Sequence, residues 1–189
     1  MRKIILCLIL VAMVASLFGN SSTPQGLIQS QAINPSEVSG NMQDFKATFK
    51  KGGFFGIFQE PGDPTYFIIR TPQAMEAHIQ SVMANFRRDT ATVPDPYLQT
   101  LESQVRDFYA GYDDNFFEKN FLVVALVAQG SGSFRYSLES LNLTNQTLTI
   151  NITHNAPMIQ TMDFVATTLL LELPTESYNV STVQVIVAP

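Results

Sequence analysis

The chain has 189 residues, 16 of them acidic and 11 basic, which gives a formal net charge of −5 at pH 7. A chain of this length buries enough apolar surface for one hydrophobic core. Its acidic balance repels polyanions and argues against binding to nucleic acid or to anionic lipid surfaces. The one cysteine, Cys7, excludes a disulfide framework within the chain.

A short basic start, Met1-Arg2-Lys3, precedes an apolar run from Ile4 to Phe18. The run is too short to cross a hydrocarbon core of roughly 30 Å, and the pattern is typical of a secretory signal peptide. We expect a signal peptide over residues 1–19, with an uncleaved membrane anchor as the alternative. Cleavage after Gly19 would leave a cysteine-free exported chain, which is extracellular or in the cell envelope.

Residues 20–44 are rich in Ser, Gln, Asn, Pro and Gly, with isolated apolar residues. Such a composition does not bury enough surface to offset the entropy of ordering. We expect a flexible tether over residues 20–44, followed by a single domain over residues 45–189. The domain opens with phenylalanines among glycines, which either pack in the core or form a binding surface. They are Phe45, Phe49, Phe54, Phe55 and Phe58.

Three helices are predicted in the middle of the chain, after a short strand at 66–70. Thr71-Pro72 is an N-cap followed by proline at the first helical position, and apolar residues follow at helical spacing. A second helix opens near Asp95-Pro96 and ends at Ala110-Gly111. Asp113 or Asp114 caps a third, short helical turn.

The rest of the chain is expected to form strands. Residues 121–128 are apolar on both faces, which indicates a central strand covered on each side. Further strands are expected at 134–139, 147–153, 164–173 and 182–187. The sequence therefore predicts an α+β fold, with an antiparallel β-sheet or sandwich of C-terminal strands. Two to three helices from the preceding segment pack on one face or end.

No residue pattern predicts a catalytic, cofactor-binding or metal site. The two histidines, His78 and His154, have no Asp or Glu at zinc-ligand spacing. The turn at 130–133, Gly-Ser-Gly-Ser, lacks the following helix that a nucleophile elbow or a phosphate loop requires. Asp113-Asp114-Asn115 has the oxygen density of a calcium site but not its spacing, and helix capping explains the same residues.

Glu172 is the one charged residue in the apolar run at 164–173. A lone carboxylate in such a run needs a partner or a place at the sheet margin. The available cation is Arg135, so we expect Arg135 to form a structural ion pair across the sheet with Glu172 or with Asp163.

Five Asn-x-Ser/Thr triplets occur, beginning at Asn20, Asn142, Asn145, Asn151 and Asn179. In a eukaryotic or archaeal host such triplets accept N-glycans. The alternative is that threonine-rich strand edges and asparagine turns produce them without modification. The last four lie in the expected domain and are its candidate glycosylation sites.

Several short blocks point to a family. The block at 113–124, Asp-Asp-Asn-Phe-Phe-Glu-Lys-Asn-Phe-Leu-Val-Val, is followed at 130–135 by Gly-Ser-Gly-Ser-Phe-Arg. Together with the later blocks at 148–150, 161–166 and 171–174, these resemble the small exported bacterial proteins grouped with PrcB, a subunit of a surface protease complex. The resemblance covers residues 112–187. It implies a cell-envelope or secreted accessory domain, often lipid-anchored, with no established catalytic residues.

Two departures from that family matter. Its members often carry a lipidated cysteine, but Leu6 precedes Cys7 where a lipoprotein signal needs a small residue. Relatives also often have a cysteine at the position of Met162, so a thiol role there is absent from this chain.

We therefore expect a non-enzymatic exported accessory domain that binds another protein, with a surface protease as one candidate partner. No cofactor and no membrane span after signal cleavage are expected. The alternative is a soluble module that binds a peptide, lipid or glycan with the phenylalanine-rich segment 45–58. An enzyme would require acid–base groups from separate segments to converge, such as Asp163, Glu172 and His154.

Overall fold

The computed structural model describes residues 29–51, 66–89, 95–130, 134–155 and 165–188. The described strands are β1 (Gln29–Ile33), β2 (Ser39–Gly40), β3 (Lys46–Lys51), β4 (Tyr66–Ile69), β5 (Asn120–Gly130), β6 (Arg135–Thr144), β7 (Thr147–Asn155), β8 (Val165–Pro174) and β9 (Thr182–Ala188). The helices are η1 (Pro35–Glu37, a 3-10 helix), α2 (Pro72–Asp89), α3 (Asp95–Phe108) and α4 (Asp114–Lys119). The fold is α+β, as the sequence predicts.

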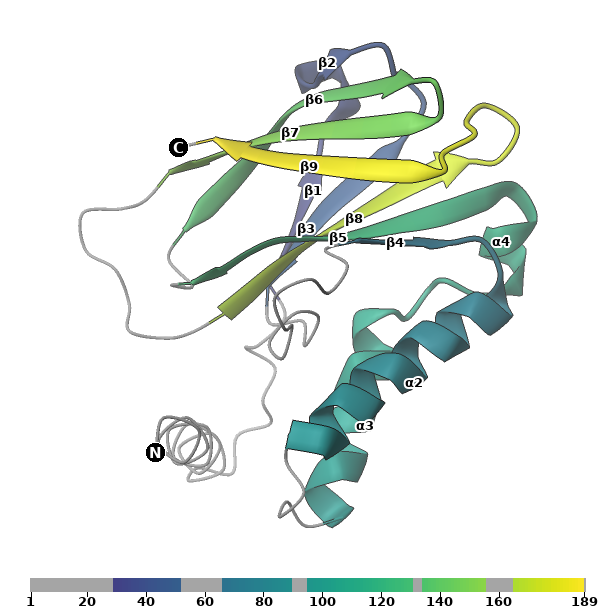
Figure 1. The fold of residues 1–189 in the computed structure, drawn as a ribbon, viewed down its shortest axis with the longest axis vertical. Coiled ribbons are helices and arrows are strands. Elements are labelled where there is room, and N and C mark those ends of the chain that lie inside the picture. The colour runs from purple at the N-terminus through teal and green to yellow at the C-terminus, as the bar shows by residue number, and fades with distance from the viewer. Residues whose placement is uncertain (1–28, 52–65, 90–94, 131–133, 156–164, 189) are drawn as a thin grey trace.

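The strands form two stacked sheets. Sheet A has the order β1-β3-β8-β5-β4 and is antiparallel, and sheet B has the order β2-β6-β7-β9. Figure 1 shows sheet B on one side of sheet A and the helices α2 and α3 on the other. The molecule is therefore a β-sandwich whose sheet A also carries a helical layer.

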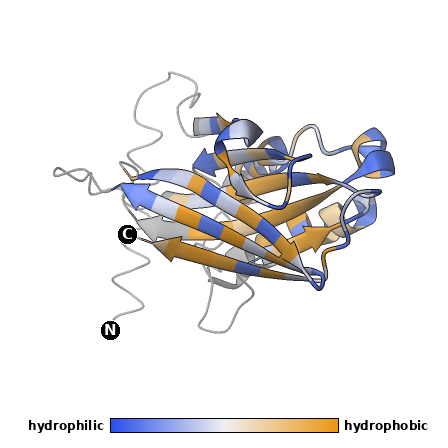
Figure 2. Cartoon of the chain, turned by 90° about the horizontal axis from the view of Figure 1, so that it is seen from above, coloured by the Kyte–Doolittle hydropathy of each residue, from blue (hydrophilic) through white to orange (hydrophobic). Residues whose placement is uncertain are grey.

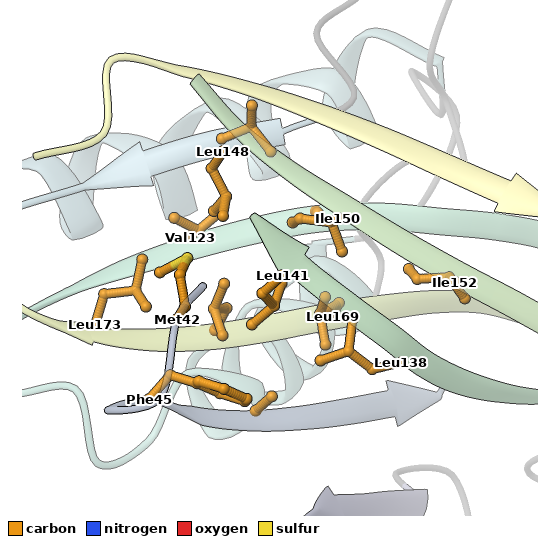
Figure 3. Packing of buried hydrophobic residues seen from close by; sticks show 14 of the residues in the cluster. Met42, Phe45, Val123, Leu138, Leu141, Leu148, Ile150, Ile152, Leu169 and Leu173 are labelled. Atoms are coloured by element: carbon orange, nitrogen blue, oxygen red, sulfur yellow. The ribbon is translucent and has the colours of Figure 1, made fainter. Parts of the chain in front are cut away.

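Core 1 fills the space between the two sheets (Figure 3). In the view from above sheet B (Figure 2), the strands of this sheet alternate between hydrophobic and hydrophilic residues, as a sheet with one buried face requires. The fully buried large side chains of core 1 include Met42, Phe121, Leu141, Leu148, Ile150, Leu169 and Leu171. Each contributes about 1.5–3 kcal/mol of transfer free energy relative to an exposed side chain.

Core 2 lies between the opposite face of sheet A and the helices. Leu122, Val124 and Leu170 point to it from β5 and β8, whereas their neighbours Val123 and Leu171 point into core 1. Strand β5 is thus covered on both faces, which confirms the central strand predicted at 121–128. The helices supply their apolar stripes to core 2, with Met75, Ile79, Met83, Leu101 and Val105 buried.

Local sequence signals set the helix starts. The Thr71 Oγ1 accepts a hydrogen bond from the Ala74 N–H at 3.1 Å, so Thr71 caps α2 as predicted. The Asp113 side chain accepts from the Phe116 N–H at 3.0 Å and caps α4. Helix capping therefore accounts for this carboxylate.

Sheet B contains parallel pairs in addition to the antiparallel hairpin β6–β7. Strand β7 also pairs in parallel with β9, and the two-residue β2 pairs in parallel with β6. The hairpin turn consists of Asn145 and Gln146 alone, with φ of 49° and 64°. Two positive φ angles in a two-residue loop are typical of a type I′ turn, whose twist matches that of the strands.

The flexible tether predicted over residues 20–44 is wrong for residues 29–44. Strand β1 pairs with β3 over its whole length, and Met42 is buried in core 1. The Asn41 side chain both donates to the Leu143 carbonyl and accepts from its N–H, which ties this segment to β6. At Gly40, with φ of 117°, an added Cβ would lie 2.0 Å from the Leu141 oxygen, so the close approach requires glycine.

Candidate interaction surface

A polar cluster lies on the helix-facing side of sheet A, and it corrects the predicted ion pair. The Lys46 Nζ lies 2.8 Å from Glu172 Oε1, and the Tyr112 hydroxyl donates to the same oxygen at 3.3 Å. Burial, and then the nearby carboxylate, raises the pKa of Tyr112 above its usual range. The predicted pair of Arg135 with Glu172 is wrong, because Arg135 is exposed on β6 of the other sheet. Asp163 lies outside the described residues.

Lys50 lies on the same face as Lys46, closer to the helices. Its Nζ donates to the Phe108 carbonyl, which ends α3, and lies 4.9 Å from the centroid of the Phe108 ring. Burial lowers the pKa of Lys50, while the negative charge of Glu172 acts in the opposite direction. The cations on this face thus bond to groups of the protein itself, and the cluster joins α3 to sheet A.

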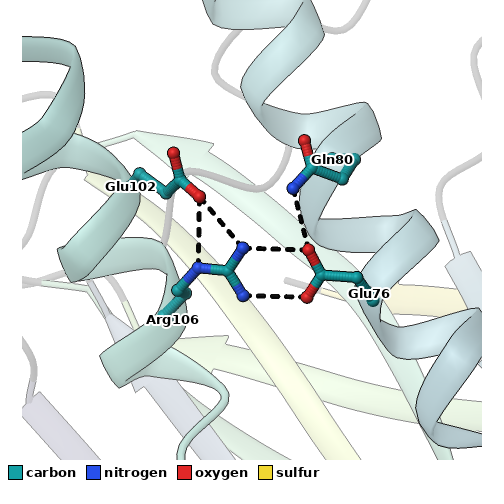
Figure 4. Close-up of polar contacts among 4 residues, drawn as sticks. All are labelled: Glu76, Gln80, Glu102 and Arg106. Carbon is teal, nitrogen blue, oxygen red and sulfur yellow. Dashed lines mark hydrogen bonds and ion pairs between the residues drawn. The ribbon is translucent and has the colours of Figure 1, made fainter.

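A second charged network joins the two long helices (Figure 4). The Arg106 guanidinium on α3 makes a bidentate contact with Glu76 on α2, at 2.8 and 2.9 Å, and also bonds to Glu102. Hydrogen bonds from Arg106 and then from Gln80 lower the pKa of Glu76 to about 2. The network joins α2 to α3. Because all four side chains are solvent-accessible, it contributes little to the free energy of unfolding.

His78 lies on the buried face of α2 and hydrogen-bonds to Tyr109. The His78 Nε2 lies 2.8 Å from the Tyr109 hydroxyl oxygen, and its ring lies 4.4 Å from that of Phe67, between centroids. Burial lowers the pKa of His78 to about 4 and raises that of Tyr109. Both side chains are nearly inaccessible to solvent. This neutral pair therefore belongs to the packing of core 2.

The other groups considered for acid–base chemistry are not brought together. His154 lies at the end of β7, where its Nδ1 is 3.1 Å from the Ala188 carbonyl oxygen. Glu172 lies on sheet A, on the face turned towards the helices. Within the described part of the chain, no group of three or more His, Cys, Asp or Glu side chains is arranged to hold a metal ion.

The phenylalanine surface predicted in segment 45–58 is wrong for the two members that the structure describes. Phe45 and Phe49 are 6% and 4% exposed and belong to core 1. Phe45, directly before β3, and Phe49, within it, point inward on either side of Ala47, while Lys46 and Thr48 point outward. Phe54, Phe55 and Phe58 lie outside the described residues.

The four candidate glycosylation sites gather on sheet B and at its hairpin end. Asn142 and Asn151 point to the outer face of the sheet, and the Asn151 amide donates to the Ser140 hydroxyl at 2.7 Å. Asn145 is exposed in the hairpin turn, and Asn179 is exposed in the loop before β9. The turn and the loop lie together, because the Ser181 N–H donates to the Gln146 carbonyl at 2.9 Å.

Strand β9 is the surface feature that the sequence analysis missed. It is the last strand of sheet B, so one of its two edges has no strand partner among the described residues. Ile186 and Val187, 42% and 38% exposed, are the large hydrophobic side chains exposed in the described part of the chain. Both lie on this one edge strand.

Devices that usually protect an edge strand are missing from β9. Natural edge strands are kept from pairing by shortness, by charged residues or by proline. The seven residues Thr-Val-Gln-Val-Ile-Val-Ala contain no charge and no proline. Among the described strands, the other three edges are β2, which has two residues, β1, which is mostly polar, and β4, which has four residues against the seven of β9. The β9 edge can therefore accept a further strand through its main-chain groups.

The fold and this edge define a class, namely an α+β sandwich domain in which the uncharged strand β9 forms a sheet edge. No described helix combines the length and the apolar character that a membrane crossing would need. Comparison of the chain with protein-family models, with curated proteins and with solved structures finds no match.

Proposed function

We propose that this chain is a non-enzymatic, exported binding domain that captures another protein by adding a strand to β9. The observation that carries the proposal is the uncharged edge with its two exposed apolar side chains, Ile186 and Val187. Strand addition uses main-chain hydrogen bonds for affinity and alternate side chains for specificity. The partner segment would be extended, with an apolar residue at every second position to meet the inward face.

Export rests on the N-terminal pattern, the basic start followed by the apolar run from Ile4 to Phe18. The partner class, a cell-envelope protein such as a surface protease, rests on the resemblance to the PrcB group. Neither expectation depends on the β9 edge, so each has its own test. The mass of the mature chain from its own host tests cleavage after Gly19.

The binding proposal is tested by affinity capture from the native envelope fraction with three baits. Wild type is compared with Ile186→Lys, which places on the edge a charge that natural edge strands use against pairing. The matched control is Ser137→Lys, because Ser137 is exposed on the outer face of β6, away from the edge. We expect a protein that wild type and Ser137→Lys retain and Ile186→Lys loses.

The same protein captured equally by all three baits would contradict the assignment to β9. Protease activity that elutes with the captured protein would support the protease partner. A captured protein without such activity would leave strand capture in place and remove the protease from the proposal.

A further inference from the structure

Core 1 continues to the side of the sandwich where β9 lies. Val185 is half-buried and Val187 is exposed, although both point towards core 1 in register with the buried Ile150 and Ile152 of β7. Strand β9 also lies over β5, the neighbour of the edge strand β4. Apolar surface on this side therefore belongs to an incompletely covered core, and an added strand would complete it.

We propose that a second copy of the chain occupies this edge, with the two β9 strands antiparallel and Val185 opposite Val185 of the other copy. This inference rests on the proposed function, in that it uses the same edge and names one occupant of it. The pairing is isologous, because the same strand serves on both sides of a two-fold axis. Two four-stranded sheets would then form one continuous sheet.

The alternation of core-facing and outward-facing side chains along β9 favours the register with Val185 at the centre. Residues directly opposite in an antiparallel pair point to the same face. With Val185 at the centre, Val183 meets Val187 of the second copy on the core side, and Gln184 meets Ile186 on the outer side. All seven residues then have a partner. In this register the exposed Val187 of one copy lies beside Val183 of the other copy, and Val183 is 5% exposed and already part of core 1. A one-residue slip would place core-facing side chains opposite outward-facing ones.

Charge also permits self-pairing. Two copies of a chain with a net charge of −5 repel each other, so their contact must avoid the acidic residues. Neither β9 nor its neighbour β7 contains Asp, Glu, Lys or Arg. The closest charged residues of sheet B, Arg135 and Glu139, lie on β6, two strands from the edge. The contact therefore brings together two uncharged strips.

This arrangement has a consequence for binding. The second copy and a captured strand would use the same main-chain groups of β9, so they exclude each other. Dissociation of the pair then precedes capture, and affinity for the partner falls as the protein concentration rises.

The test is disulfide trapping in a Cys7→Ser background, which removes the one native cysteine. Opposite residues in an antiparallel pair have Cα atoms about 4.5–5.5 Å apart, within the span that a disulfide bridges. Val185→Cys should therefore give a covalent dimer under mild oxidation at micromolar concentration, and a reductant should reverse it. Gln184→Cys is the matched control, because its two copies would be offset to roughly 8 Å, beyond disulfide reach.

Sedimentation equilibrium of the uncrosslinked chain supplies the second measurement. We expect a dimer that Ile186→Lys converts to a monomer and Ser137→Lys leaves intact. Equal trapping of Val185→Cys and Gln184→Cys, or no trapping with a monomeric mass, would overturn the self-pairing. A monomer that still captures a partner through β9 would overturn the second copy and leave the proposed function standing. A dimer with no β9-dependent capture would contradict the proposed function and leave the self-pairing standing.

Discussion

At the scale of single residues, burial of His78 predicts a pH dependence of stability. The folded chain has a His78 pKa of about 4, and an unfolded histidine titrates near 6.5. Between these values the unfolded state binds more protons, so the stability present above pH 6.5 is lost as the pH falls towards 4. The contribution is about 2–3 kcal/mol between pH 7.5 and pH 4.5.

Urea unfolding at both pH values tests this contribution. Wild type should lose more unfolding free energy on acidification than His78→Gln, which keeps a polar side chain but does not titrate. Because acidic residues act equally in both proteins, the difference isolates His78. An identical loss in the two proteins would contradict a neutral, buried His78.

The ion pair of Glu172 shows what residue patterns predict and what they leave open. That a lone carboxylate in an apolar run needs a partner follows from the cost of desolvation. Its partner is Lys46 rather than Arg135, because β3 and not β6 lies beside β8 in the sheet. The order of strands depends on the whole fold, and the local sequence around Glu172 does not contain it.

At the scale of elements, the β6–β7 turn carries a measurable strain. Gln146 has a φ of 64°, a conformation that costs a non-glycine residue free energy and that glycine adopts without strain. Gln146→Gly would give the Asn-Gly sequence that type I′ turns favour. We expect it to raise the unfolding free energy by about 0.5–1 kcal/mol, measured by thermal or urea unfolding.

A matched control is Thr147→Gly, one residue further on in β7. Glycine within a strand lowers stability, so this variant should unfold more easily than wild type. Destabilisation by Gln146→Gly would show that the Gln146 side chain contributes more than its backbone strain costs.

The elements with local signals were predictable, and those without were not. Thr71-Pro72 and Asp113 mark helix starts by capping chemistry that needs no tertiary contact. Strand β1, Gln-Ser-Gln-Ala-Ile, has the composition of a disordered segment and is ordered by its pairing with β3. Met42 is likewise one apolar residue among polar ones. Its burial depends on where the sandwich closes.

At the scale of the whole molecule, β8 contributes side chains to both cores, so we expect the two cores to unfold as one cooperative unit. Leu170 lies in core 2 and its neighbour Leu171 in core 1, both fully buried. We expect Leu170→Ala and Leu171→Ala each to cost about 2–5 kcal/mol. Each should unfold in one transition, with coincident far-UV and near-UV circular dichroism curves.

The exposed loop variant Ser177→Ala is the control and should leave the midpoint close to that of wild type. If Leu170→Ala released the helical signal at a lower temperature than the sheet signal, the helical layer would be a separate unit. Such a result would contradict the expectation of a single domain.

The β9 edge could not be predicted from its sequence, although the strand itself was. Alternation at 182–187 predicts a strand with one buried face. It does not say whether that strand has one neighbour or two, and the core-facing Val187 is exposed because β9 has one. Phe49 of β3 shows the opposite case, since β3 has neighbours on both sides and lies under sheet B.

Amide hydrogen exchange at residues 182–188 tests most directly the claim that β9 is the interaction surface. The measurement compares dilute chain, concentrated chain and chain bound to a captured envelope protein, each with wild type and Ile186→Lys. In wild type, the β9 amides that point away from β7 should exchange at least about tenfold more slowly when concentrated or bound, and Ile186→Lys should remove this protection. Exchange of these amides at one rate in all three wild-type samples would contradict the account.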